Sequence, residues 1–252
     1  MYLWKCWRDN RFRFIVFLIL MVAFAWLVHM QVLLQNKIMR FTLSVVPELA
    51  HEYWRDLSEQ IGTGFFFPCL FTMALGSSGV GDEYARGTAE FLLTRPRSRR
   101  YFIWVSWFTG ALEVLTIVLT FVLLAFLAAI YVTRILYTWR FLVMVVPIFL
   151  FAMVAYGVIG LMTALQRSGR KGYATGLGLL VLYVLVYDVL QLRWGFHVPR
   201  PTDLMHRFSE LATDASGVHS SSGFPVVAIV GWSLFALACP LLSQMYIDRT
   251  DV

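Results

Sequence analysis

Long apolar runs separated by short charged segments form the main pattern of this sequence. Six of these runs are long enough for an α-helix to cross a hydrocarbon layer about 30 Å thick, which takes roughly 20 apolar residues. The runs predict membrane spans near residues 14–34, 61–80, 102–133, 141–165, 173–192 and 224–247. We therefore expect an all-α membrane protein in which residues 1–252 form a single six-span domain.

Short helices are also expected at the membrane surface. Residues 1–13 alternate aromatic side chains such as Trp4 with cations such as Lys5, which is typical of an interfacial helix or of a positive flank that only sets orientation. Residues 35–60 have apolar positions at helical spacing and predict a small outer surface helix. The third apolar run is too long for a perpendicular helix, so either part of residues 101–112 lies at the membrane surface or this helix tilts.

The composition excludes an ordinary soluble domain, since 59% of the residues are hydrophobic and 14% charged, with a mean hydropathy of +0.69. The positive-inside rule orients the spans: a cytosolic N-terminus places thirteen of the 21 Lys and Arg residues in cytosolic segments and eight in the longer outer segments. An even number of spans then places both termini in the cytosol. The net charge of +6 is therefore a topology signal and does not indicate nucleic-acid binding.

The cysteines and the first apolar run add little chemistry. Cys6 falls in the cytosolic head, whereas Cys69 and Cys239 fall within spans, and their spacing fits no metal motif. We expect neither a disulfide nor a metal site. The first run is too long for a signal-peptide core and lacks a small-residue cleavage site, so we expect it to be retained as a span.

The most charged and glycine-rich connection is the segment from Gly76 to Arg100. Its first four residues, GSSG, are similar to the serine motif of intramembrane proteases, but the five histidines lie near the opposite ends of the spans, too far from Ser78 to act as its base. Gly76 to Gly81 also matches the start of a phosphate-binding loop, but carboxylates follow where that loop needs Lys and Ser or Thr. We expect these glycines to form the closely packed inner end of the second span.

The next part of this connection, residues 82–94, has the features of a short amphipathic helix on the cytosolic side. Asp82 can cap its N-terminus, acidic side chains interleave with Arg86, and Pro96 ends the run. A basic cluster that can bind lipid phosphates then leads into the third span. Its members are Arg95, Arg97, Arg99 and Arg100.

Two acidic residues fall within predicted spans, and such acids are candidates for a transport path. Glu113 lies toward the inner end of the third span. Asp188 lies near the outer end of the fifth span, close to Arg193. Residues 114–133 alone are long enough to cross the membrane, so Glu113 is expected near the inner surface, and Asp188 is expected near the outer surface; a structural role is left open for each.

The cytosolic segment resembles a motif between the second and third spans of ABC-2 type permeases, the membrane subunits of many bacterial ABC exporters. The order of features along the chain is similar as well, with an aromatic and basic N-terminal elbow, six spans and a long outer connection before the last span. The likeness is specific over about twenty residues. They read Glu83-x-x-Arg86-Gly87-Thr88-x-Glu90-x-Leu92-Leu93-x-x-Pro96-x-Ser98-Arg99.

The resemblance implies that residues 82–94 form a coupling helix that docks into a groove on a separate ABC ATPase subunit. A short rigid helix tied to two spans can transmit a rigid-body movement, whereas a flexible loop would absorb it. The residues that the resemblance implies for this dock are Glu83, Arg86, Gly87, Thr88, Glu90, Phe91 and Leu92.

Family membership would also imply a bacterial cytoplasmic (inner) membrane location and a pair of permeases, either a homodimer or a heterodimer. ATP and Mg would bind to two partner ATPase subunits, so this chain is expected to be no enzyme and to hold no cofactor. It would contact membrane lipids and no nucleic acid. The leading prediction is an exporter subunit, whose cargo the sequence does not specify.

Other classes of protein explain parts of the pattern. An autonomous ion- or proton-coupled carrier would use Glu113 and Asp188 without ATP. A membrane scaffold would account for the lipid-binding basic cluster but gives no reason for Arg86-Gly87-Thr88.

Overall fold

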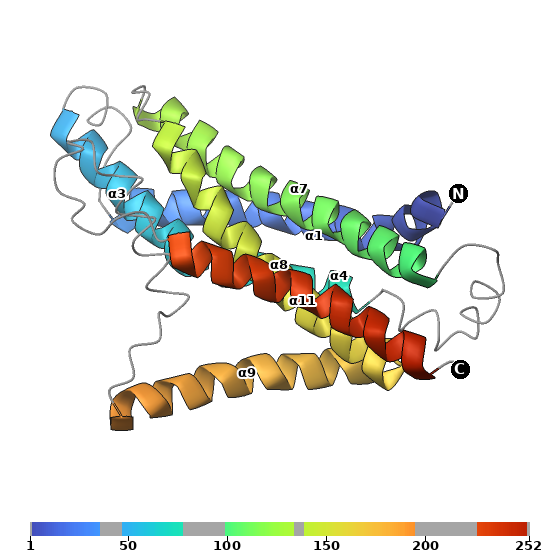
Figure 1. Cartoon of the computed structure of the whole chain (residues 1–252). Helices are drawn as coiled ribbons and strands as arrows, with labels where there is room; N and C mark the ends of the chain where they lie inside the picture. Colours follow the sequence, from blue (N-terminus) through green and yellow to red (C-terminus); the bar gives the residue numbers. More distant parts are fainter. Residues whose placement is uncertain (1, 36–46, 78–98, 134–138, 195–225, 251–252) are drawn as a thin grey trace.

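The computed structural model describes residues 2–35, 47–77, 99–133, 139–194 and 226–250. Within these ranges the chain is nearly all helical and contains no strand, which confirms the all-α prediction (Figure 1). The elements are α1 (Tyr2–Gln35), α3 (Pro47–Gly64), α4 (Phe66–Gly76), α7 (Arg99–Thr133), the 3-10 helix η1 (Trp139–Met144), α8 (Val145–Gln166), α9 (Gly169–Trp194) and α11 (Val226–Thr250).

The helices run back and forth between two ends of one elongated bundle. In Figure 1, α1 and α7 lie side by side and run in the same direction, whereas α8 and α11 run in the opposite direction. The described N-terminal and C-terminal residues lie at the same end. Helix α9 packs against α8 near its beginning and diverges from the other helices toward its C-terminal end.

Four of the described helices are long and apolar enough to cross a membrane. They agree with the first, third, fourth and sixth predicted spans. By length and composition, the described residues therefore contain four of the six predicted spans. The four segments are Asn10–Leu34, Arg100–Tyr131, Leu142–Gln166 and Val226–Arg249.

The second predicted span has a different shape from the one expected. The predicted outer surface helix and the span were separated at residue 60, but α3 continues to Gly64 and α4 begins only two residues later, at Phe66. Pro68 explains the position of this break, because proline has no N–H to offer the carbonyl of Gly64 and its ring crowds that carbonyl. The inner end of the predicted span, beyond residue 77, lies outside the described residues.

The two longest helices continue without a break where surface segments were considered. Helix α7 has 35 residues, or about 52 Å at 1.5 Å per residue, and residues 101–112 belong to it. Helix α1 runs from Tyr2 through the first span. Neither surface segment is separated from its span by a turn, which favours a tilted or protruding α7 over a distinct surface piece.

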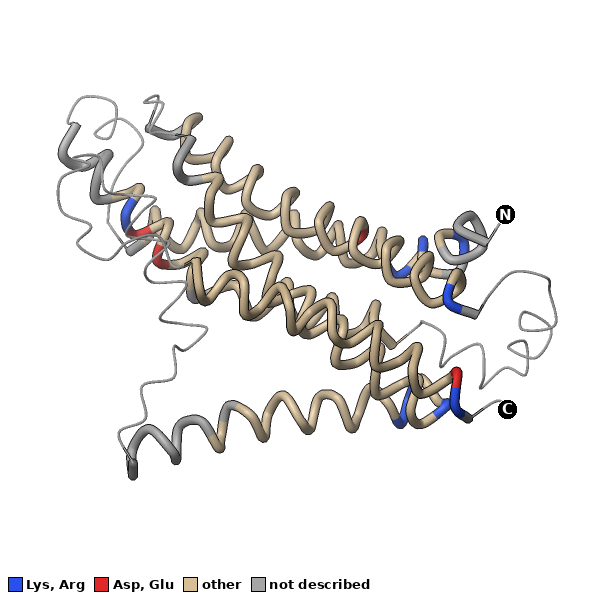
Figure 2. The backbone as a smooth tube through the Cα atoms, viewed as in Figure 1, with Lys and Arg blue, Asp and Glu red and all other residues tan. Residues whose placement is uncertain are grey.

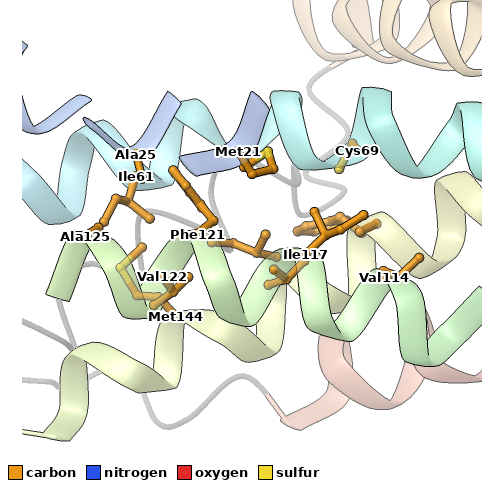
Figure 3. Close-up of a cluster of buried hydrophobic side chains, with 14 of the residues drawn as sticks. Met21, Ala25, Ile61, Cys69, Val114, Ile117, Phe121, Val122, Ala125 and Met144 are labelled. Carbon is orange, nitrogen blue, oxygen red and sulfur yellow. The ribbon is translucent and has the colours of Figure 1, made fainter. Parts of the chain in front are cut away.

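The main core lies where α1, α3, α4, α7 and α8 meet. Figure 3 shows Met21 of α1, Ile61 of α3 and Phe121 of α7 in this core. Phe121 also stacks with Phe24, with ring centroids 5.5 Å apart. Such stacked aromatic pairs add to the gain from burial.

Helix α8 is the central helix, and glycine allows its neighbours to approach it closely. A Cβ added to Gly76 of α4 would lie 2.7 Å from the carbonyl oxygen of Tyr156, and one added to Gly157 would lie 3.0 Å from Cβ of Cys239 in α11. Gly172 of α9 meets the backbone of α8 even more closely. Small residues at helix contacts are typical of membrane bundles, where close packing takes the place of the hydrophobic effect.

Candidate functional site at the basic end of the bundle

Apart from Glu113 in α7, the described charged residues lie toward the two ends of the bundle, with tan residues between them (Figure 2). One end holds the start of α1 and α7, the α8–α9 turn and the end of α11. We call it the basic end. Its described charged side chains are Arg8, Arg11, Arg13, Arg100, Arg167, Arg170, Lys171 and Arg249, with Asp248 as the one acid among them. The opposite end holds Arg55, Asp56 and Glu59.

The described residues on either side of the predicted docking helix are the end of α4 and the start of α7, which lie toward the basic end. Helix α4 ends at Gly76, where the Ser77 hydroxyl donates a hydrogen bond to the carbonyl of Ala74 at 2.8 Å. Helix α7 begins at Arg99. The residues predicted for the dock and most of the basic cluster lie outside the described residues, namely Glu83, Arg86, Gly87, Thr88, Glu90, Phe91, Leu92, Arg95 and Arg97.

Arg100 is the member of the predicted basic cluster whose side chain the structure describes. It is exposed at the start of α7, and its Nε lies 3.7 Å from a carboxylate oxygen of Asp248 near the end of α11. An exposed ion pair of this kind contributes little to stability. The pair nevertheless brings the first turn of α7 beside the last turns of α11.

A small cavity of about 40 Å³ lies between α4, α7, α8 and α11, toward the basic end. Gly76, Trp107, Gly160 and Pro240 are among its lining residues. The indole nitrogen of Trp107 is buried and has no hydrogen-bond partner among the described residues. The cavity is large enough for a few water molecules. In protein interiors such waters bind to buried polar groups such as this indole N–H. Sequence reasoning missed the cavity, because its lining comes from four distant parts of the chain.

Glu113 lies inside the bundle rather than at its surface. Its side chain is 2% exposed, and one carboxylate oxygen, Oε2, accepts a hydrogen bond from the Asn10 amide of α1 at 3.4 Å. The other oxygen, Oε1, has no partner in the described part of the chain. Glu113 does not line the cavity described above. The contact joins the beginning of α1 to α7.

Among the residues that the structure describes, the remaining candidates are not brought together into a chemical site. Asp188 belongs to α9, and its side chain lies outside the part that the structure describes. Cys69 and Cys239 are buried free thiols in separate helices. Among the described residues, no group of His, Cys, Asp and Glu could hold a metal ion.

A buried hydrogen bond near the opposite end was also missed by sequence reasoning. The Tyr53 hydroxyl of α3 lies 2.5 Å from Nδ1 of His29 in α1, and both side chains are almost fully buried. Burial raises the pKa of the Tyr53 phenol. Because 24 residues separate the partners, the sequence offered only the apolar spacing around Tyr53 as a signal.

The apolar helices and the charges at the bundle ends define a multi-pass membrane protein. A sequence model of the family described as "ABC-2 family transporter protein" matches residues 7–239. The chain therefore belongs to this family and is an ABC-2 type permease, a membrane transport component of a kind that works with an ABC ATPase subunit. None of the curated proteins compared with it matches the chain.

Proposed function

We propose that this permease exports its cargo by coupling to ATP hydrolysis in a separate ABC ATPase, which docks on residues 82–94. The observation that carries the proposal is the family match over residues 7–239. The helices on either side of this segment support it, because α4 ends toward the basic end and α7 begins there. Helices α4 and α7 would carry movement of the docked helix into the bundle.

The proposed topology has six spans with both termini in the cytosol. The alternating directions of α1, the α3–α4 pair, α7, α8, α9 and α11 support it (Figure 1). The concentration of Arg and Lys at the end that holds both termini supports a cytosolic basic end. Helix α9 has 26 residues, which is long enough to supply the fifth crossing.

The partners follow from the same proposal. Two permease copies, identical or different, would assemble with two ATPase subunits, and ATP and Mg would bind on those subunits alone. The basic cluster from Arg95 to Arg100 would bind lipid phosphates at the inner membrane surface. No nucleic acid takes part in this scheme.

Co-purification with charge-reversal variants tests the proposal. The protein purified from native membranes should carry an ABC ATPase, and Arg86→Glu or Glu90→Arg should weaken that association, because these charges would orient the docked helix. Glu59→Arg is the matched control, since Glu59 is an exposed acid at the opposite end of the bundle. An ATPase that binds equally well to all four proteins would refute the assignment of the dock.

A second candidate function has one structural observation in its favour. Glu113 is a buried acid within a span, and one of its oxygens has no partner among the described residues, as expected of a site that binds a proton or cation. Transport by the purified chain alone in liposomes, lost in Glu113→Gln or Asp188→Asn, would support such a carrier. We favour the ATP-driven permease because the family match extends over most of the chain.

A further inference from the structure

Helices α4 and α7, which flank the proposed docking segment, contact the central helix at the same residue. That residue is Tyr156 of α8, whose side chain is 6% exposed. Gly76, the last residue of α4, packs against the Tyr156 backbone, and Gly110 of α7 packs against its ring. Tyr156 therefore contacts both the helix that precedes the docking segment in the chain and the helix that follows it.

Each of the two contacts leaves no room for a side chain on the glycine. A Cβ at Gly76 would lie 2.7 Å from the Tyr156 carbonyl oxygen and 3.2 Å from Cβ of Ile159, and neither neighbour can move without shifting α8. A Cβ at Gly110 would overlap the hydroxyl end of the Tyr156 ring. Both helices thus fit against Tyr156 with little freedom to slide.

A long hydrogen bond also joins the Tyr156 ring to α7. The Tyr156 hydroxyl donates to the backbone carbonyl of Ser106 at 3.4 Å. Ser106 lies one turn before Gly110 on the same face of α7. The Tyr156 ring therefore contacts one face of α7, where Gly110 leaves space for the ring and Ser106 accepts its hydrogen bond.

The packing beside Tyr156 is less complete. The cavity of about 40 Å³ is lined by Tyr156 itself and by residues of α4, α7, α8 and α11. Pro240, on its α11 side, interrupts the hydrogen bonds of that helix. Side chains that line a void have fewer packing contacts. The contacts of Tyr156 are therefore a larger share of the packing between α7 and α8 in this region.

We propose that Tyr156 is a positioning residue. It makes the end of α4 and the first half of α7, which lie toward the basic end, move together with α8. This inference rests on the proposed function, in which the ATPase pushes or pulls on the segment between α4 and α7. With Tyr156 held by both helices, that movement reaches the central helix as a rigid-body displacement. Without this contact, α7 moves relative to α8 and the displacement is lost at the cavity.

Distances between two spin labels test this inference in the complete complex with its ATPase. Nitroxides replace Phe108, a half-exposed residue of α7, and Gln166, an exposed residue at the end of α8. The native cysteines are replaced by alanine, and the label distance is measured without nucleotide and with ATP and vanadate. The test variant is Gly110→Ala, and its control is Gly231→Ala, because an added Cβ at Gly231 meets nothing within 4 Å.

In the unaltered chain and in the control, we expect the label distance to be the same with and without nucleotide. In Gly110→Ala, we expect the label distance to change when nucleotide is added, because the displaced Tyr156 ring no longer holds α7 against α8. Tyr156→Phe, which removes only the hydroxyl, should give a smaller shift in the same direction and serves if Gly110→Ala does not fold. A variant that is merely less stable would melt earlier without gaining such a shift.

Two results would overturn the inference. One is a nucleotide-dependent shift of equal size in the unaltered chain, and the other is no shift in either variant of the Gly110–Tyr156 contact. Failure of the proposed function gives a different result, since no ATPase would then co-purify with the unaltered chain.

Discussion

Glu113 is the one buried acid among the acidic side chains that the structure describes. Its contact with Asn10 joins two helices that start at the basic end, and this contact needs only a hydrogen-bond acceptor, not a charge. The sequence identified Glu113 as exceptional because it interrupts an apolar run. It could not identify Asn10 as the partner, because 103 residues separate the two and only the fold brings them together.

Replacing Glu113 tests whether its charge matters. Glu113→Gln keeps an oxygen that can accept the Asn10 hydrogen bond, so we expect a melting temperature close to that of the unaltered chain and intact ATPase binding. Glu113→Lys places a cation in the buried site, which costs about 2.5–3.5 kcal/mol on insertion scales and should lower the melting temperature strongly. The comparison uses thermal unfolding in detergent. Loss of ATP-driven activity in a stable Glu113→Gln protein would contradict the structural role.

The hydrogen bond between Tyr53 and His29 makes a second residue-scale prediction, with a pH dependence. Tyr53→Phe should lower stability by about 0.5–1.5 kcal/mol near neutral pH, the usual net contribution of one hydrogen bond. Burial raises the pKa of Tyr53 above its ordinary value of 10.0. The unfolded chain then loses this proton at a lower pH than the folded chain, so the stabilisation present below about pH 10 is lost as the pH rises further.

Melting temperatures of both proteins at about pH 8 and about pH 11 measure this effect. The unaltered chain should lose more stability than Tyr53→Phe between the two values. An identical loss in the two proteins would show that Tyr53 does not contribute to the alkaline dependence.

At the scale of the elements, the apolar runs predicted the main helices because a span's length and composition are local properties. The same local signals placed the boundary between α3 and α4 incorrectly, since they gave no weight to Pro68 at the start of an otherwise uniform run. They also did not identify Tyr156. Its importance comes from glycines on two other helices, and single glycines in apolar runs are common in membrane proteins.

The close packing of α9 on α8 can be tested with a matched pair of glycines in the same helix. Gly172 meets the backbone of Thr163, whereas an added Cβ at Gly178 meets nothing within 4 Å. Gly178→Ala should leave the melting temperature unchanged or raise it, because alanine is favoured over glycine in helices by about 1 kcal/mol. Gly172→Ala should lower it, because the two helices must separate.

Thermal unfolding of the two variants gives the answer directly. A Gly172→Ala protein as stable as Gly178→Ala would show that α8 and α9 do not pack as closely as the structure describes.

The whole molecule combines a closely packed bundle with one strongly basic end (Figure 2). The sequence predicted this charge distribution, because thirteen of its 21 cations fall in the predicted cytosolic segments. It also predicted the family, which the match over residues 7–239 confirms. The docking residues remain a prediction, since they lie outside the described residues.

Site-specific photo-crosslinking in native membranes tests the docking claim most directly. Phe91, an apolar residue predicted for the dock, is replaced by a photoreactive phenylalanine, and Glu59 at the opposite end is replaced in the same way as a control. The account predicts a covalent adduct between the chain and an ABC ATPase from position 91 and none from position 59. An ATPase that co-purifies with both proteins but forms an adduct from position 59 alone would contradict it.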